Sequence, residues 1–373
     1  MIYLDNAATT RPNEQAVLRA SEAVSSIWYN PSALYEGGCL ARKTIDSARE
    51  KLLLFAADSS AFELIFTSCG TEADNQAIFG AAKRGNFVTT AGEHAAVYAC
   101  AQELKNRGVE VRYAPLRSDG SVDCEALLNL VDGNTSLVSV MHVNNETGAI
   151  NPVAELAARI KQINPRTVFH SDGVQAFGKI PVRLTKHIDL YSVSAHKIGG
   201  LKGVGALIKR KSLSLSPYLY GGGQEGGKRS GTENVLGILA FSYSADSAFH
   251  ALEENAKRVS FLREKLWNSL DKNIFFRLSS VSGTPYILSV SASGLKGEVL
   301  QRMLSDKGVY VGTGSACSSK RPHSRVMEAC GHKKELLEGV LRLSFSAETT
   351  EEEIVEAARI INNVAARLQG RLK

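Results

Sequence analysis

The sequence lacks features that are typical of several protein classes, and each absence argues against one of those classes. Its six cysteines lie at positions 39, 69, 100, 124, 317 and 330. They are scattered without CxxC spacing, which argues against a zinc site or a disulfide framework. No stretch reaches the roughly eighteen apolar residues of a membrane span, and the start lacks the charged-then-apolar pattern of a signal peptide. We therefore expect a cytoplasmic protein without a bound metal, in which a working thiol stays reduced.

The sequence also has no strong excess of charge of either sign. Its 44 basic and 38 acidic residues give a formal net charge of +6, and the basic residues are spread along the chain. A run such as Lys209-Arg210-Lys211 is more typical of a solvated face than of a nucleic-acid footprint. Hydrophobic residues make up 44% of the chain, as in an ordinary globular protein. We expect no direct contact with nucleic acid or with a membrane.

Between about residues 45 and 210, short apolar segments alternate with helical ones. Strands are expected at 62–67, 87–90 and 137–141, and they precede helices expected at 71–83, 96–107 and 153–163. This alternation predicts an α/β unit whose mainly parallel sheet is covered by helices on both faces.

The pattern changes after the glycine-rich segment 221–227. A long helix is expected over 234–270, and strands at 286–292 and 340–345 then alternate with helices near 297–306 and 350–368. Thr350 and Glu353 form a capping-box pattern at the start of the last helix. We expect this second part to be a smaller α+β domain.

An acid and a lysine follow two expected buried strands. Asp172 ends the segment 167–172, and Lys197 comes just past the segment 188–194, with Gln175 between them. Because ligands bind at the carboxyl edge of an open α/β sheet, we expect these side chains to meet there. A lysine amine can form a Schiff base with an aldehyde, and a carboxylate can keep a pyridinium nitrogen protonated. The set is therefore typical of pyridoxal-phosphate chemistry, although each residue alone would pass for a surface lysine or a turn-forming acid.

One of the cysteines has an unusual setting. Cys317 lies within a stretch of small polar residues between Tyr310 and Arg325. No apolar periodicity runs through this stretch, so we expect a mobile, exposed loop. Free cysteine is usually a core residue, whereas a thiol in such a loop is available as a nucleophile. Cys317 is therefore a candidate catalytic residue.

Several motifs follow one another along the chain. They are Tyr3-Leu4-Asp5-Asn6-Ala7-Ala8-Thr9-Thr10, Asn30-Pro31-Ser32, Thr67-Ser68-Cys69-Gly70-Thr71-Glu72-Ala73, Glu93-His94, Val143-Asn144-Asn145-Glu146-Thr147-Gly148, Asp172-Gly173-Val174-Gln175, Ser194-Ala195-His196-Lys197, Arg229-Ser230-Gly231-Thr232 and Gly314-Ser315-Ala316-Cys317. With these motifs the chain resembles, nearly end to end, the cysteine desulfurases of the NifS/IscS type, within the class V aminotransferase branch of pyridoxal-phosphate enzymes. The resemblance implies the type I fold, with a large cofactor-binding domain at 16–249. It also implies a small domain, formed by 1–15 and 250–373, that carries the Cys317 loop.

The resemblance assigns a cofactor site. The cofactor-binding residues that it implies are Gly70, Thr71, His94, Asn145, Asp172, Gln175, Ser194, Ala195, His196, Lys197 and Thr232. The phosphate would be held by Gly70, Thr71, Ser194 and His196, and Thr232 would reach it from the partner subunit of a homodimer. Gly70 and Thr71 also stand at an expected strand-to-helix turn, where free N–H groups suit an anion. An ordinary N-cap at Thr71 is the alternative interpretation.

The resemblance also assigns residues to the ring and the substrate. His94 would stack on the cofactor ring and move protons. Asn145 and Gln175 would supply neutral hydrogen bonds to the ring hydroxyl and to the surroundings of the lysine. Arg342 would grip the α-carboxylate of the substrate by two hydrogen bonds, with Asn145 beside it. Because apolar residues flank Arg342, we favour this role over that of an exposed arginine on an edge strand.

The implied reaction converts L-cysteine to L-alanine. Lys197 and His94 would move protons while Cys317 attacks the substrate sulfur and keeps it as a persulfide. The sulfur would then pass to an acceptor protein, in iron–sulfur cluster assembly or tRNA thiolation. Because the chain stops at Lys373, soon after its last expected helix, the resemblance favours a tRNA-thiolating enzyme as the acceptor. A class V transaminase or a selenocysteine lyase is the alternative enzyme, and a non-catalytic paralogue acting as an interaction protein is the alternative outside enzymes.

Two positions depart from the family pattern. Gly226 stands where the family usually has an arginine before its Arg-Ser-Gly-Thr motif. Tyr35 occupies the place of a common histidine. Neither position carries the central chemistry, so both bear on the subtype rather than on the activity.

Overall fold

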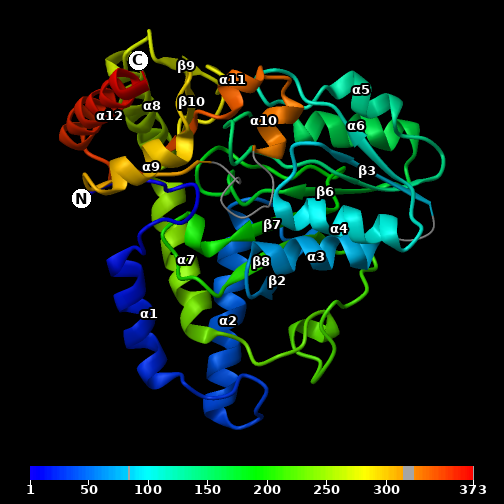
Figure 1. Cartoon of the computed structure of the whole chain (residues 1–373). Helices are drawn as coiled ribbons and strands as arrows, with labels where there is room; N and C mark the ends of the chain where they lie inside the picture. The colour runs from blue at the N-terminus through cyan, green and yellow to red at the C-terminus, as the bar shows by residue number, and fades with distance from the viewer. Residues whose placement is uncertain (83–84, 314–322, 373) are drawn as a thin grey trace.

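The computed structural model describes residues 1–82, 85–313 and 323–372, and its main feature is a seven-stranded sheet (Figure 1). The strand order is β2-β8-β7-β6-β5-β3-β4. The strands are β2 Phe62–Thr67, β3 Asn86–Thr90, β4 Val111–Ala114, β5 Thr135–Ser139, β6 Val168–Asp172, β7 Leu190–Ser194 and β8 Gly205–Arg210. All neighbouring pairs from β7 to β4 are parallel, whereas β8 is antiparallel to both of its neighbours. The prediction of an α/β fold with a mainly parallel sheet is confirmed.

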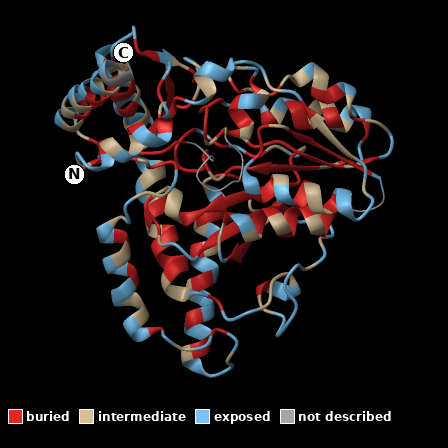
Figure 2. Cartoon of the chain, in the orientation of Figure 1, coloured by how far each residue is buried: buried red, intermediate tan, exposed pale blue. Residues whose placement is uncertain are grey.

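Helices cover both faces of this sheet. They include α2 Glu36–Leu54, α3 Gly70–Ala81, α4 Ala95–Asn106, α5 Cys124–Asn129, α6 Val153–Ile163 and α7 Val235–His250. Successive side chains of a strand point to opposite faces, so Leu137 packs in the cluster with α3 and α4 while Val138 packs in the cluster with α6 and α7. Figure 2 shows the resulting band of buried residues through the centre of the molecule. This burial on both faces explains why the strands read as short apolar runs rather than as alternating ones.

A second hydrophobic core lies beside the first. It is built on the antiparallel sheet β12-β10-β9 and on helices that pack against it. These elements are β9 Phe275–Arg277, β10 Ile287–Ala292, β12 Val340–Ser344, α8 Leu252–Ser269, α9 Gly297–Ser305 and α12 Glu351–Leu372. The N-terminal strand β1 (Ile2–Leu4) pairs in parallel with β11 (Val309–Val311), and Ile2 and Leu4 are part of this core. The remaining α-helices of the described residues are α1 Glu14–Ser26, α10 Arg325–Ala329 and α11 Lys334–Leu337.

The predicted long helix over 234–270 is wrong, because it is two helices, α7 and α8, that meet at an angle of 73°. Ala251 between them has φ −103° and ψ 15°, outside the helical range. The buried apolar residues of α7 belong to the first core and those of α8 to the second. The bend therefore allows the two consecutive helices to pack in different cores. Among the described residues, no single helix has the length and apolar content of a membrane span, and only this bent pair passes when its two helices are counted together.

Smaller features of the structure confirm the predictions from the sequence or differ from them by a few residues. The capping box is confirmed: Glu353 accepts from the Thr350 backbone N–H at 3.0 Å, and the Thr350 hydroxyl accepts from the Glu353 N–H at 3.2 Å. The strand expected at 137–141 lies at 135–139, and this leaves Met141 beyond its end. The helix expected at 71–83 begins one residue earlier, at Gly70, and ends at Ala81.

Candidate active site

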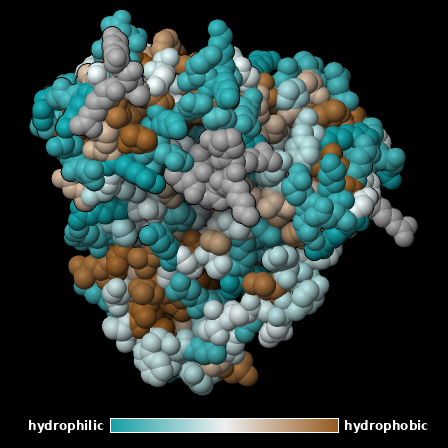
Figure 3. Space-filling model, in the orientation of Figure 1, coloured by the Kyte–Doolittle hydropathy of each residue, from teal (hydrophilic) through white to brown (hydrophobic). Residues whose placement is uncertain are grey.

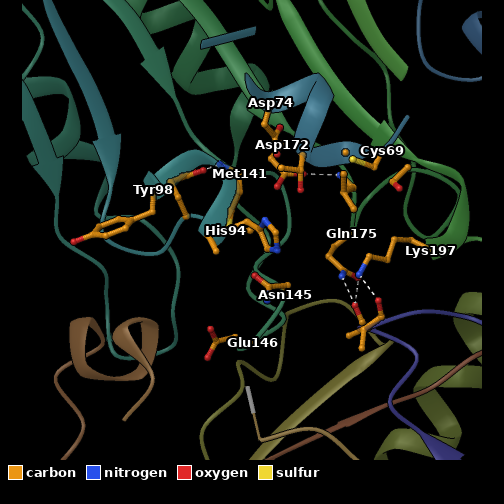
Figure 4. A pocket seen from close by; sticks show the side chains of 18 of the residues that line it. Cys69, Asp74, His94, Tyr98, Met141, Asn145, Glu146, Asp172, Gln175 and Lys197 are labelled. Carbon is orange, nitrogen blue, oxygen red and sulfur yellow. Dashed lines mark hydrogen bonds between the residues drawn. The ribbon is translucent and has the colours of Figure 1, made fainter. Parts of the chain in front are cut away.

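A cavity of about 610 Å³ opens at the carboxyl ends of the parallel strands (Figure 4). Asp172 ends β6 and Ser194 ends β7, which continues into a 3-10 turn over Ala195–Lys197. His94 follows β3 directly before α4. The predicted site residues that line the cavity are Gly70, Thr71, His94, Asn145, Asp172, Gln175, Ser194, His196, Lys197 and Arg342. Segments far apart in the sequence are therefore brought to one cavity by the sheet topology.

Two predicted residues within the described ranges are not part of this lining. Ala195 is buried within the turn before Lys197. Thr232 is exposed and lies outside the cavity of its own chain. Cys317 lies outside the described residues.

The Lys197 amine is held in a defined position at the cavity. It donates to the backbone carbonyls of Ala7 and Ala8, each at 2.7 Å. Burial and the positive charge of Arg342 lower the pKa of Lys197 to about 8, against the opposing effect of Asp172. Roughly a tenth of this amine is therefore unprotonated at pH 7, far more than for an ordinary lysine, and this is the form that attacks a carbonyl carbon.

Polar side chains surround Asp172, which is itself buried. Its carboxylate accepts from the Val174 N–H at 2.9 Å, and burial raises its pKa while the charges of His94 and Lys197 oppose that rise. His94 Nδ1 accepts from the Ala96 N–H at 3.2 Å, so in the neutral ring the proton is on Nε2. Burial also lowers the pKa of His94. The ring is thus a neutral group that can stack on a flat cofactor and present its Nε2.

Asp74, which the sequence did not single out, lies next to Asp172. One polar atom each of Asp74, His94 and Asp172 lies within 4.8 Å of the other two. Burial and the neighbouring carboxylate of Asp172 raise the pKa of Asp74 well above its usual range. Behind it, His170 Nε2 lies 3.5 Å from Asp74 Oδ1 and 3.0 Å from the Ser192 hydroxyl. The spacing of Asp74, His94 and Asp172 could hold a metal ion. The two buried carboxyls, with their raised pKa values, equally suit the protonated ring nitrogen of a cofactor. The absence of a metal therefore stays a prediction.

The start of α3 forms the anion-binding corner of the cavity. Cys69 is the N-cap residue and makes no side-chain cap, so the interpretation of Thr71 as the N-cap is wrong. Gly70 is the first helical residue, and a Cβ there would come within 2.8 Å of Val174. The Ser194 hydroxyl is buried and has no hydrogen-bond partner among the residues that the structure describes. Free helical N–H groups and an unpartnered hydroxyl at one point fit a phosphate.

His196 also lines the cavity. Its Nδ1 is 3.1 Å from the Thr9 hydroxyl. Burial and the charge of Lys197 lower its pKa to about 4, so the imidazole is neutral at physiological pH. It therefore offers the cavity a neutral ring nitrogen rather than a second cation.

Arg342 is one of the cations that line the cavity. Its guanidinium donates to Asp5 Oδ1 at 2.8 Å and to the Asn145 carbonyl at 3.0 Å. Its Nε is buried and has no hydrogen-bond partner within the described ranges. Gly312 pairs with Arg342 through two backbone hydrogen bonds and covers the strand, so the side chain is buried rather than exposed on an edge. The Nε–H without a partner can donate to a carboxylate oxygen, in line with the predicted substrate role.

Glu93 and Arg325 are among the lining residues that carry no predicted role. Glu93 is buried, and burial raises its pKa to about 8. Arg325 donates to the backbone carbonyls of Ala91 and Glu93 and lies over the Tyr98 ring at 3.9 Å from its centroid. Glu93 belongs to the Glu93-His94 motif, so the sequence carries a signal that it is a site residue. The motifs suggest no role for Asp74 or Arg325.

The described residues fit pyridoxal phosphate. The α3 N-terminus, without a side chain at Gly70, and the unpartnered Ser194 hydroxyl suit the phosphate. Asp172 suits the ring nitrogen, and the amine of Lys197 lies in the same cavity. When bound, this cofactor supplies an electron-withdrawing ring that weakens the bonds at the α-carbon of an amino acid.

Comparisons with known proteins agree with this site. The family model for class V aminotransferases matches residues 2–356. A cysteine desulfurase of Nostoc sp. is 35% identical over 381 residues, which cover 99% of this chain and 94% of the relative. A cysteine desulfurase IscS of Methanosarcina thermophila is 36% identical over 383 residues, which cover 99% of this chain and 93% of the relative.

Solved structures show the same likeness. A NifS-like protein superposes with a TM-score of 0.92 at 35% identity, covering 98% of this chain and 99% of that one. The structure of SspA in complex with cysteine superposes with a TM-score of 0.81 at 28% identity, covering 94% of this chain and all of that one. The chain therefore belongs to the class V aminotransferase family, as a pyridoxal-phosphate-dependent cysteine desulfurase of the NifS/IscS type.

Proposed function

We propose that this desulfurase transfers the sulfur of L-cysteine to Cys317, which holds it as a persulfide and passes it to an acceptor protein. The reaction balances without a further reactant: L-cysteine and the Cys317 thiol give L-alanine and the Cys317 persulfide. The proposal rests on the placement of the two ends of the segment that carries Cys317. Gly312 is bonded to Arg342, and Arg325 lines the cavity, so both flanks of that segment are fixed beside the substrate site.

The residues of the cavity have different roles in this reaction. The unpartnered Nε of Arg342 receives the α-carboxylate of cysteine, which orients the substrate. The Lys197 amine, with its pKa near 8, accepts and returns the proton of the α-carbon. His94 lies between Asp172 and Asn145 (Figure 4). There its Nε2 can move a proton other than the α-carbon proton that Lys197 moves. Asp172 holds the proton of the ring nitrogen.

Of the described cysteines, only Cys69 lines the cavity, so it is the competing nucleophile. Cys100 and Cys330 are buried, and burial raises the pKa of each thiol to about 12. Neither thiol is ionised at neutral pH, and neither lies at the cavity. The choice between Cys317 and Cys69 is therefore the point to test.

The test compares Cys317→Ala with the matched variant Cys69→Ala. We expect Cys317→Ala to bind the cofactor and L-cysteine yet to lose alanine formation and protein-bound labelled sulfur. Cys69→Ala should keep both. Labelled sulfur that persists in Cys317→Ala and disappears in Cys69→Ala would overturn the proposal. Transfer of the label to an iron–sulfur scaffold and to a tRNA-thiolating enzyme, side by side, then shows which acceptor class is served.

We also propose that the enzyme is a homodimer in which Thr232 completes the partner's phosphate site. Thr232 is exposed in the single chain. The α1–α2 connection and the segment between β8 and α7 extend from the same end of the molecule (Figure 1). Exposed apolar side chains lie there: Leu34 is 95% exposed, Tyr220 82% and Trp28 69%. Figure 3 shows further hydrophobic surface over α1, and a second copy of the chain would cover such a surface.

The segment that carries Thr232 is anchored from inside the chain. The Glu225 carboxylate is paired with Arg49 and accepts from the Phe66 N–H at 2.9 Å. Glu225, Gly226 and Gly227 all have left-handed backbone, with φ of 50°, 63° and 77°. An arginine at position 226 would be strained in this conformation, so the departure from the family pattern follows from a local turn.

A further inference from the structure

A second lysine, Lys179, is buried behind the active site. Its side chain is 5% exposed, and its amine donates to Gln175 Oε1 at 3.0 Å. No carboxylate lies within ion-pair distance of this amine in the described part of the chain. Burial and the charges of Lys197 and Arg342 lower its pKa to about 7. A buried amine whose main polar contact is a neutral amide costs stability, so its position calls for a role beyond packing.

Lys179 is the first member of a chain of contacts that ends at Lys197. Gln175 Nε2 donates to the Ala7 carbonyl at 2.8 Å, and the Lys197 amine donates to the same carbonyl at 2.7 Å (Figure 4). The Lys179 amine donates to Gln175 Oε1, and in its charged form it can only donate, so the oxygen end of the Gln175 amide faces it. The nitrogen end then faces Ala7. An amide nitrogen carries two hydrogens, so a second N–H stays available to the cavity.

We propose that Lys179 is a positioning residue of the desulfurase, which fixes the Gln175 amide so that it presents N–H rather than oxygen to the cofactor. A turned amide would bring its NH₂ against the Lys179 amine and its oxygen against the Ala7 carbonyl, and both hydrogen bonds would be lost. An N–H that faces the ring hydroxyl favours its ionised form, whereas an amide oxygen disfavours it. Lys179 thereby acts on the cofactor without touching it.

The test measures the cofactor without substrate, so it does not depend on the persulfide at Cys317. Lys179→Met removes the donor and keeps the length of the side chain. We expect the pH midpoint of the visible absorption of the bound cofactor to rise by about one unit, the size of one hydrogen bond to a charged group. We also expect the Kd for pyridoxal phosphate to rise by roughly tenfold. Lys179→Arg keeps the donor, and a neighbouring cavity of about 150 Å³ leaves room for it, so its midpoint should stay near that of the wild type.

A double-mutant cycle separates positioning from packing. If Lys179 acts through Gln175, Lys179→Met should cause no further shift of the midpoint in a Gln175→Met background. The same shift in both backgrounds, or an unchanged midpoint in the folded single variant, would overturn the inference. Should Lys179→Met not fold, Lys179→Leu, which also lacks a donor, takes its place in the cycle. A wild-type protein that binds no cofactor would instead contradict the enzyme class.

Discussion

Glu93 makes the stability of the protein depend on pH in a way that one substitution can isolate. Its side chain is 1% exposed. Its Oε1 accepts from the Thr90 hydroxyl at 2.8 Å and from the Met141 N–H at 3.0 Å, whereas Oε2 has no partner among the described residues. Burial raises the pKa of this carboxyl from 4.5 to about 8. Folding therefore requires Glu93 to hold a proton that the unfolded chain releases above pH 4.5.

The sign and size of the effect follow from this pKa. The stabilising contribution of protonated Glu93 is complete below pH 4.5 and is lost as the pH rises towards 8, by roughly 5 kcal/mol in total. Glu93→Gln keeps the Oε1 acceptor but places an NH₂ at the other position, with one more unpartnered N–H than the hydroxyl of protonated Glu93 has, which costs about 1 kcal/mol at every pH. We therefore expect the variant to be less stable than the wild type near pH 5 and more stable above pH 8.

Urea unfolding of the cofactor-free protein, followed by far-UV circular dichroism at several pH values between about 5 and 9, measures the difference in free energy of unfolding between Glu93→Gln and the wild type. The exposed Glu22 on α1 is the control, because Glu22→Gln should change the free energy of unfolding little and equally at every pH. A gap between Glu93→Gln and the wild type that stays constant with pH would refute the reasoning.

Three more predictions concern the cofactor and the assembly. Lys197→Ala should lose the visible band and the turnover, and borohydride reduction of the wild type followed by peptide mapping should label Lys197 and no other lysine. Gly70→Ala should raise the Kd for pyridoxal phosphate at least about tenfold, because its Cβ would meet Val174 at 2.8 Å, whereas Gly133→Ala, which meets nothing within 4 Å, should bind normally in the same fluorescence titration. Mixing inactive Lys197→Ala and impaired Thr232→Ala subunits should restore activity in heterodimers with one intact site; an active monomer by ultracentrifugation, or no recovery on mixing, would contradict the shared site.

The sequence predicts the sheet and much of the site because both depend on local patterns. Asp172 and Ser194 end apolar runs, and the rule that parallel strands present their carboxyl ends at one edge brings them together. The break at Ala251 was missed because apolar periodicity continues across it, while the change of core that causes it is a tertiary event. Asp74 and Lys179 were missed for a related reason. Each is a single polar residue in an otherwise ordinary segment, and its meaning lies in a neighbour that only the fold supplies.

The carbonyls that hold Lys197 have a consequence for the order in which the molecule is completed. Ala7 and Ala8 follow β1, whose partner strand β11 begins at Val309, and the Ala7 N–H is bound by the Ser344 hydroxyl 337 residues away. During synthesis the first residues must therefore wait for almost the whole chain before they can dock. Until they do, the amine of Lys197 lacks both of its acceptors. The surroundings of Lys197 are thus completed only after the two ends of the chain have met.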